Sequence, residues 1–238
     1  MTQLRNTFVA TILFFTLAFQ SACTVEVELS ELTEGEAVEI IEAALQDFAG
    51  GLTSNIEDIS EQILEAVSSG ALCDTLYTQS IEENYQRGQV QSSYQTELSY
   101  EMSCNSLNFP ESATFTSSTD YDYSTLRITS DDDARFLGSI SGLLVSDSSL
   151  VLVGNYESSG SQDLNFNSQR SVASTFTVNL TNLEVNKTEI EIITGSGDFT
   201  FTAEIQGNTS TFTGSISFMG DDSLMLTLND NTYTFDLN

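Results

Sequence analysis

The sequence contains no histidine, no tryptophan and only one proline among its 238 residues. Without histidine the chain cannot form a Ser-His-Asp or Cys-His catalytic arrangement, or a zinc site with histidine ligands. The absence of tryptophan weakens the case for a site that stacks sugar rings, without excluding one. A single proline and a hydrophobic content of 39% are typical of a folded chain.

Basic residues are also scarce, because 6 Lys and Arg stand against 35 Asp and Glu, which gives a net charge of -29. Proteins bind nucleic acids mostly through cations that neutralise phosphates, so this class of partner is excluded. Anionic lipid or polysaccharide surfaces would be repelled as well, unless divalent cations bridge the two.

The first 22 residues have the features of an export signal. A single cation precedes an apolar run at 7–19, which is too short to span a bilayer as a helix. The run ends in the relaxed lipobox Gln20-Ser21-Ala22-Cys23, small residues directly before a cysteine. We therefore predict a lipid on Cys23 and a location in the cell envelope, at the outer membrane. An ordinary secretory signal cut near Ala22, leaving a soluble protein, is the alternative.

The cysteine count supports lipidation. Three cysteines in an oxidising compartment leave one thiol without a partner. Acylation of Cys23 removes the odd thiol, so that Cys73 and Cys104 are predicted to form one disulfide.

We divide the chain into a signal peptide at 1–22, a tether at 23–32, a helical segment at 33–70 and an antiparallel β domain at 71–238. In the helical segment Thr33 and Glu36 have the spacing of a capping box, and apolar residues follow at helical spacing up to a double glycine. Ser54 and Glu57 have the same spacing before a second helix. The acidic residues of both helices are expected to form a solvated face, opposite apolar stripes that pack on each other or on the sheet.

The chain from Cys73 to Cys104 has the period of two that is typical of strands, and Gly88-Gln89 is suited to the loop of a hairpin. This register places Tyr77 opposite Tyr100 and Cys73 opposite Cys104 on one face. The other face is almost wholly polar. Residues directly opposed in a hairpin lie within reach of a disulfide.

The rest of the chain is predicted to form a meander of short strands. Asp230-Asn231 is the predicted loop of the last hairpin, which sets Leu226 opposite Phe235. The fold class is therefore mainly β, with an N-terminal amphipathic helix pair followed by an antiparallel β-meander, as a sandwich or an open or closed barrel. The predicted strands lie near 113–116, 122–128, 135–144, 150–156, 172–180, 183–193, 199–205, 212–218, 224–228 and 233–237.

Three segments follow the lipobox in an order that is itself informative: LTEGEAVEIIEAALQDFAGGLT, a Cys-to-Cys hairpin that ends in CNSLNFP, and the Thr- and Ser-rich tail FTGSISFMGDDSLMLTLNDNTYTFDL. Over most of the mature chain this order resembles uncharacterised envelope lipoproteins of Bacteroidota-type bacteria. The resemblance implies an envelope location and a helical pair followed by a β-meander. It implies no activity, ligand or catalytic residue.

The densest acidic cluster consists of Asp120, Asp122, Asp131, Asp132 and Asp133. Calcium binds clustered carboxylates, which makes a calcium site one hypothesis for these residues. An EF-hand loop does not fit, because Thr125 occupies the position that requires glycine. Aspartate is also common in turns, and 131–133 and 221–222 are both predicted to lie where strands reverse, so solvated turns are the other reading.

Four tyrosines, Tyr77, Tyr85, Tyr94 and Tyr100, lie on one face of the predicted hairpin, as core residues or as the lining of a ligand cleft. No residue is identified as catalytic, and calcium is the only cofactor considered. The sequence favours a non-enzymatic envelope lipoprotein whose β domain contacts other macromolecules, with the membrane bound through the lipid. A carrier of an apolar small molecule comes second and an acid-catalysed hydrolase third. The oligomeric state is left open.

Overall fold

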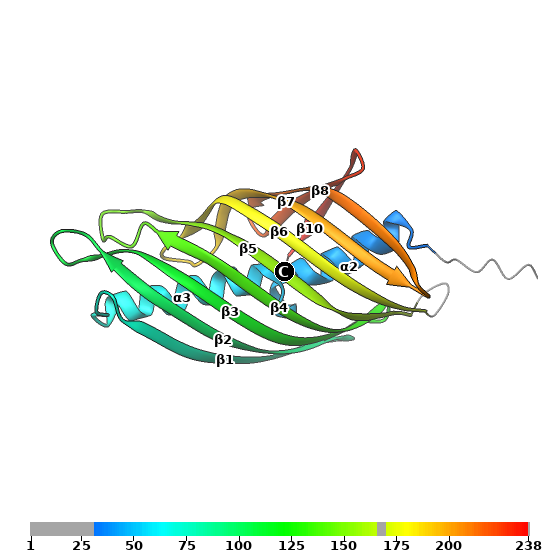
Figure 1. Ribbon diagram of the computed structural model, residues 1–238, viewed down its shortest axis with the longest axis horizontal. Helices are drawn as coiled ribbons and strands as arrows, with labels where there is room; N and C mark the ends of the chain where they lie inside the picture. Colours follow the sequence, from blue (N-terminus) through cyan, green and yellow to red (C-terminus); the bar gives the residue numbers. More distant parts are fainter. Residues whose placement is uncertain (1–30, 166–169, 238) are drawn as a thin grey trace, which may run out of the picture.

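The computed structural model describes residues 31–165 and 170–237. Two α-helices and a 3-10 turn come first and ten strands follow (Figure 1). The elements are α2 (Glu34–Leu45), η1 (Asp47–Ala49), α3 (Leu52–Ser68), β1 (Leu76–Arg87), β2 (Val90–Cys104), β3 (Pro110–Ser124), β4 (Ile128–Ser141), β5 (Ser149–Leu164), β6 (Arg170–Asn186), β7 (Ile192–Ile205), β8 (Asn208–Gly220), β9 (Ser223–Leu228) and β10 (Asn231–Asp236). The predicted signal peptide and Cys23 lie outside the described residues.

The strands form one antiparallel sheet in which each strand pairs with its neighbours in sequence, from β1 at one margin to β10 at the other. The predicted helix pair and meander are confirmed, and of the architectures left open the chain adopts a single open sheet. The helices α2 and α3 lie along one face of it (Figure 1). We refer to this as the inner face, and to the opposite one as the outer face.

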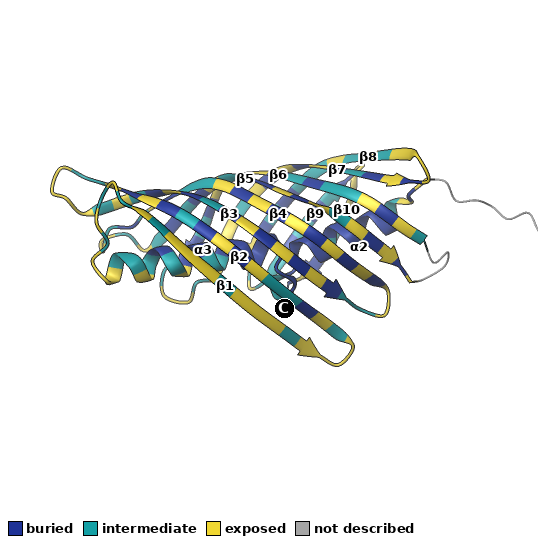
Figure 2. Ribbon diagram, turned by 60° about the horizontal axis from the view of Figure 1, so that its bottom comes forward, coloured by how far each residue is buried: buried dark blue, intermediate teal, exposed yellow. Residues whose placement is uncertain are grey.

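The core lies between the inner face and the helices. Side chains along each strand are alternately buried and exposed, as the banding of Figure 2 shows, because successive residues point to opposite faces. The large inward side chains Phe136, Tyr156, Phe176 and Phe201 are almost fully buried. They belong to the same hydrophobic cluster as the helical residues Ile41, Leu45, Leu52, Ile56, Ile59 and Ile63.

The two helices are joined by a compact turn. The capping box at Thr33 and Glu36 is confirmed. The predicted cap at Ser54 is wrong, because α3 begins earlier, with Gly51 as its N-cap. Gly50 has a φ of +75°, and a Cβ on Gly51 would lie 2.5 Å from the carbonyl oxygen of Ala44, so the double glycine allows the turn.

Asn55 of α3 is the polar link between the helices and the sheet. Its Nδ2 donates to the carbonyl oxygens of Gly50 and Gly51, at 3.0 Å each. Its Oδ1 accepts from the hydroxyls of Ser117 at 3.1 Å and Thr119 at 3.0 Å, both on β3. Only 1% of Asn55 is exposed, so this side chain positions the turn, α3 and β3 relative to one another within the core.

Carboxylates of α2 join that helix to three separated parts of the sheet. Glu34 accepts hydrogen bonds from side chains of β10. Glu36 forms an ion pair with Arg170 at the start of β6, and Glu39 forms one with Arg127 between β3 and β4. Two of the chain's few cations thus hold the first helix against the curved sheet.

The predicted first hairpin is confirmed. Tyr77 pairs with Tyr100, and the register runs unbroken from Leu76 to Arg87. Cys73 and Cys104 form the predicted disulfide, with their Cα atoms 5.7 Å apart.

Three other turns differ from the prediction. The two strands predicted at 172–180 and 183–193 are one strand, β6, up to Asn186, and the chain reverses at 187–191. Residues 131–133 lie within β4, and the chain reverses instead at 125–127. The last hairpin turns at Asn229 and Asp230, both with positive φ, so that Leu226 pairs with Tyr233 and not with Phe235. This slip by two residues leaves each side chain on its predicted face, because the period of a strand is two.

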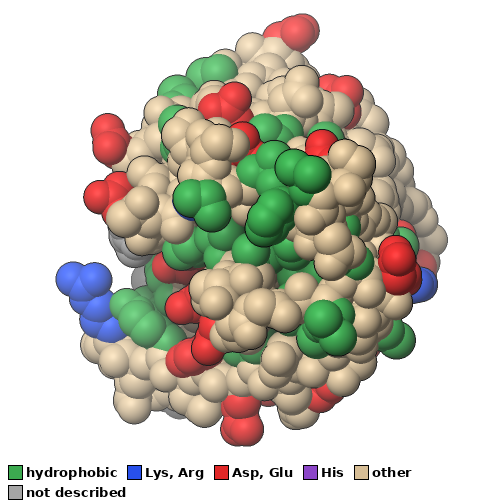
Figure 3. Space-filling view, turned by 90° about the vertical axis from the view of Figure 1, so that its left-hand side faces the viewer, with side chains coloured by type: hydrophobic (Ala, Val, Ile, Leu, Met, Phe, Trp, Pro, Cys, Tyr) green, Lys and Arg blue, Asp and Glu red, His purple; other side chains and the backbone are tan. Residues whose placement is uncertain are grey.

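Loops at one end of the molecule carry the disulfide and the connection between β2 and β3. This end lies opposite the start of α2 (Figure 1), and hydrophobic side chains gather on it (Figure 3). Among the described residues, no helix has the length and apolar character needed to cross a membrane.

The Asn55 link predicts a specific loss of stability. Asn55→Ala removes four hydrogen bonds from the core, and we expect the free energy of unfolding to fall by about 2 to 3 kcal/mol in urea melts. Glu61→Ala, an exposed change on the same helix, should alter it by less than about 0.5 kcal/mol. Equal effects of the two changes would contradict the role given to Asn55.

Candidate functional site

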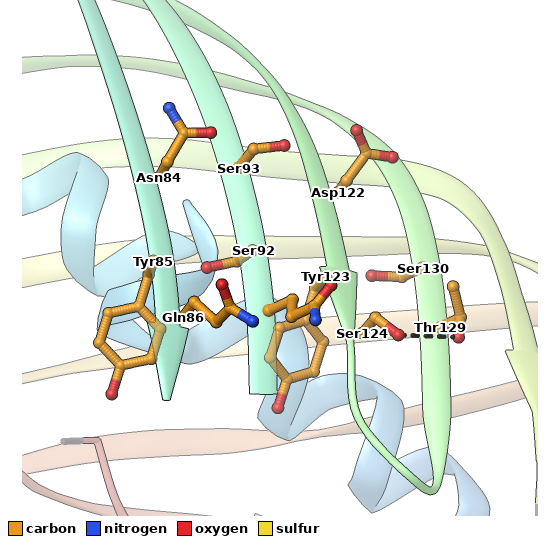
Figure 4. A pocket seen from close by; sticks show the side chains of 11 residues that line it. Asn84, Tyr85, Gln86, Ser92, Ser93, Asp122, Tyr123, Ser124, Thr129 and Ser130 are labelled. Carbon is orange, nitrogen blue, oxygen red and sulfur yellow. Dashed lines mark hydrogen bonds between the residues drawn. The ribbon is translucent and has the colours of Figure 1, made fainter. Parts of the chain in front are cut away.

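Two adjoining hollows open on the outer face of β1–β4, with volumes of about 530 and 300 Å³. They share Asn84, Ser93 and Asp122, which lie in a row across three strands (Figure 4). No helical residue lines either hollow, and most of the lining side chains point outward, so we place both on the outer face. Inward residues, among them Tyr85 and Tyr123, also contribute to the lining. We name them together the outer groove. Its outward side chains are Glu82, Asn84, Gln86, Gln91, Ser93, Gln95, Asp120, Asp122, Ser124, Thr129 and Asp131.

The outward side chains of the outer groove are all polar, and they come from even-numbered residues of β1 and β3 and odd-numbered residues of β2 and β4. Its side chains are amides, hydroxyls and carboxylates. One contact within it joins the hydroxyls of Ser124 and Thr129 at 3.3 Å (Figure 4). Such a surface offers many hydrogen-bond acceptors and negative charges to a ligand.

Like charges are opposed across the strands of this groove. Asp120 pairs with Asp133, and Asp122 pairs with Asp131. Directly opposed like charges destabilise a sheet. Partial desolvation, and then the neighbouring Asp133 carboxylate, raise the pKa of Asp120. A positively charged ligand would relieve this repulsion.

The structure divides the five aspartates of the predicted calcium cluster between the two faces. Asp120, Asp122, Asp131 and Asp133 are exposed on the outer face, whereas Asp132 is buried on the inner face. Asp132 therefore cannot share a ligand with the other four. Within residues 31–165 and 170–237, no group of three or more acidic or cysteine side chains is arranged to hold a metal ion.

The buried Asp132 is accommodated by its neighbours on β5. Its Oδ1 accepts a hydrogen bond of 2.6 Å from Nε2 of Gln162. Gly160 is the residue directly opposite, and a Cβ there would lie 2.2 Å from the same oxygen. Burial raises the pKa of Asp132 to about 6, and the neighbouring Ser130 and Gln162 side chains oppose this effect.

A second acidic cluster, at Asp47, Glu57 and Asp58, was missed by the sequence analysis. Burial, reinforced by Asp47, raises the pKa of Glu57 to about 8. Burial also raises the pKa of Asp58 to about 7, although the hydroxyl of Tyr94 donates to Asp58 at 3.3 Å. The expectation of a solvated helical face is wrong at these positions. A helical pattern alone does not reveal that the sheet curls around more than one side of α3.

A third feature is a cleft of about 420 Å³ between α2 and the turns of β1–β2 and β3–β4. Glu39 and Glu42 line it together with Arg127 and apolar residues such as Leu126 and Ile128. Burial is the main cause that raises the pKa of both glutamates, and Arg127 opposes the effect. The cleft thus combines apolar walls with weakly acidic carboxyl groups.

The four tyrosines of the first hairpin point to the inner face and are used in packing. Tyr77 stacks on Tyr100, with ring centroids 5.4 Å apart. Tyr85 stacks on Phe48 of η1 at 4.9 Å. Tyr94 contacts α3, as described above. The core reading is confirmed for Tyr100, and Tyr77 and Tyr94 are partly buried against the core. Tyr85 lies outside the hydrophobic cluster and lines the larger hollow.

The chain matches no family model, no curated protein and no solved structure. The resemblance to Bacteroidota-type lipoproteins therefore stays a prediction. The function has to be inferred from the geometry of this chain.

The partly buried Glu57 predicts a dependence of stability on pH. Its pKa is about 8 in the folded chain against an ordinary 4.5, so between these values the folded state keeps a proton that the unfolded state has lost. Stability therefore falls as the pH rises through this window. We expect Glu57→Gln to raise the melting temperature by about 2 to 4 °C at pH 8.5, and to have little effect at pH 5.

The matched control for this prediction is Glu204→Gln, which removes the same charge from an exposed position on β7. Melting curves of both variants at the two pH values separate local burial from net charge. A Glu57→Gln protein that is less stable than the parent at pH 8.5 would contradict the assignment.

Proposed function

We propose that this protein is a non-enzymatic interaction module of the bacterial cell envelope, held to a membrane by a lipid on Cys23. In this proposal the outer groove binds a basic segment or surface of another macromolecule. The observation that carries the proposal is the groove itself, a continuous hollow of polar and acidic side chains across four strands.

The filled inner face supports an interaction role over carriage inside the sheet. A carrier of apolar molecules needs a cavity lined by apolar side chains. Here the apolar side chains of the inner face pack directly against α2 and α3 in one cluster. On the outer face, the outward side chains of the outer groove are accessible and polar.

Charge supports a basic partner. The chain carries a net charge of -29, and the opposed pairs Asp120–Asp133 and Asp122–Asp131 concentrate negative charge at the groove. Electrostatic complementarity of this kind accelerates encounter and selects partners more than it adds affinity. A basic partner would gain from the field of the whole protein and would also remove a local repulsion.

Carriage of a small amphiphile is the second candidate, because the cleft at Glu39 and Glu42 has apolar walls and a volume of about 420 Å³. A ligand with an apolar body and a cationic group would suit it. Native mass spectrometry of protein purified from its own membrane separates the candidates. A stoichiometric bound amphiphile would favour carriage.

The anchor is tested by Cys23→Ser. If the lipid on Cys23 holds the protein to the membrane, the variant should move from the membrane to the soluble fraction after cell lysis, with its fold unchanged by circular dichroism. A variant that is processed normally and stays with the membrane would contradict the lipid anchor and leave the groove proposal intact.

The groove is tested by titrating a ten-residue oligolysine into the Cys23→Ser protein at physiological salt. We expect the double variant Asp120→Asn, Asp122→Asn to weaken binding by about three- to tenfold, because each screened charge pair contributes up to about 1 kcal/mol. Calorimetry or fluorescence anisotropy gives the affinity.

The control is Glu184→Gln, Glu204→Gln, which removes two charges from β6 and β7 and leaves the groove intact. If both double variants weaken binding equally, only net charge matters, and the groove is not a site. The calcium hypothesis is tested by the same titration with calcium chloride in place of the peptide. It requires that the parent protein binds calcium, that the groove double variant does not, and that the control double variant does.

A further inference from the structure

The two edge strands of the open sheet, β10 and β1, differ in length and in their contacts with the rest of the fold. At β10 the strand is only six residues long, and Glu34 of α2 accepts hydrogen bonds from Asn231 at 2.7 Å and Tyr233 at 2.6 Å. At the other margin β1 extends over 12 residues. Among the described residues, no strand pairs with its free side, and Figures 1 and 2 show nothing alongside it.

The strand β1 also lacks most of the devices that protect sheet edges. Proteins usually blunt an edge with proline, lysine, a bulge or a short strand. The segment LYTQSIEENYQR contains neither proline nor lysine, and its pairing with β2 has no register shift. Its one device of this kind is Glu83, which places a charge on the inward side of the strand. Alternate backbone N–H and C=O groups along β1 therefore point away from β2, in position to pair with another strand.

Space for inward side chains exists beneath this edge. A hollow of about 410 Å³ lies between the C-terminal part of α3 and the start of β1. Its apolar lining consists of Ala66, Ala71, Tyr77 and Tyr100. Polar side chains line the rest, namely Gln62, Glu65, Ser69 and Gln79. The hydroxyl of Tyr100 is buried there without a hydrogen bond of ordinary geometry.

An apolar surface adjoins the same end of β1. Leu72, Leu76, Leu107 and Phe109 are 66%, 67%, 73% and 58% exposed, and all lie within five residues of the disulfide that joins 73 to 104. Figure 3 looks at this end of the molecule and shows hydrophobic side chains gathered there. Clustered exposed apolar side chains mark contact surfaces.

The charge near the edge indicates which strand would fit. Outward residues of β1 and β2 include Glu82, Glu97 and Glu101, and no cation. A second copy of the chain would place its own acids against these, in a protein that already carries a net charge of -29. A strand with basic outward residues would meet complementary charge instead.

We propose that β1 accepts, as an eleventh strand, an extended segment of a partner protein in which basic and apolar residues alternate. Its apolar side chains face inward, toward the hollow beneath the edge, and its basic side chains face outward, toward Glu82. Backbone hydrogen bonds supply affinity, and the alternation supplies specificity. The inference deepens the proposed function, since it gives the form of the basic partner.

The test uses a twelve-residue peptide of alternating lysine and valine with the Cys23→Ser protein. Amide exchange by NMR should show alternate amides of β1 becoming protected on binding, with β5 unchanged. Glu82→Gln should weaken binding by about two- to fivefold, and Glu204→Gln should not. Glu82 also lines the outer groove, so the protection of the β1 amides decides which of the two sites the peptide occupies. Methylating the peptide amides along the edge that faces β1 should weaken binding by about tenfold or more.

Three peptide controls are needed: one with its lysines and valines in two blocks, one methylated on every valine amide and one methylated on every lysine amide. If all three bind like the parent, the attraction is only one of charge, and the proposal fails. If the free protein forms a dimer and the peptide dissociates it, the edge of β1 binds a second copy of the chain. That result would also overturn the proposal. The oligolysine titration with Asp120→Asn, Asp122→Asn tests the outer groove alone. Amide protection and amide methylation test the edge of β1, so each proposal can fail while the other stands.

Discussion

The inner face of the ten-stranded sheet stays out of water because α2 and α3 cover it. A single sheet with one apolar face cannot bury that face alone, and here no second sheet is present among the described residues to make a sandwich. Two helices placed end to end supply the missing layer. Their apolar residues join those of the strands in one cluster, and Asn55 adds the polar contacts that orient α3 on β3. The curl of the sheet, its open margins and the positions of its acids all follow from this packing.

The same packing accounts for the unusual acids of this protein. A curled sheet encloses more than one side of a helix, so that Glu57 and Asp58 become partly buried although they lie beside the apolar stripe of α3. On the outer face the pleat brings Asp120 opposite Asp133 and Asp122 opposite Asp131. With six cations for 35 acids, most of these charges have no ionic partner within the chain, which is why a basic partner is the natural complement.

Much of the fold could be predicted from local patterns. The first hairpin was predictable because its period of two, its Gly88 loop and its cysteines all agree on one register. The cap at Thr33 was predictable because it depends on two side chains three residues apart. Residues 131–133 were misplaced because the preference of aspartate for turns was overridden by pairing along β4, where Gly160 makes room for Asp132. The outer groove and the free edge of β1 depend on the arrangement of several strands in space, which no local pattern specifies.

The dependence of the sheet on its helices is tested most directly by native-state hydrogen exchange on the intact protein. If α2 and α3 complete the core, the amides of α3 and of the central strands β3–β6 should open together, with the free energy of global unfolding and with the same dependence on denaturant. The opposite result is that the amides of α3 exchange through an opening of much lower free energy while β3–β6 stay protected. That result would show that the sheet is stable without its helical layer and would contradict the account.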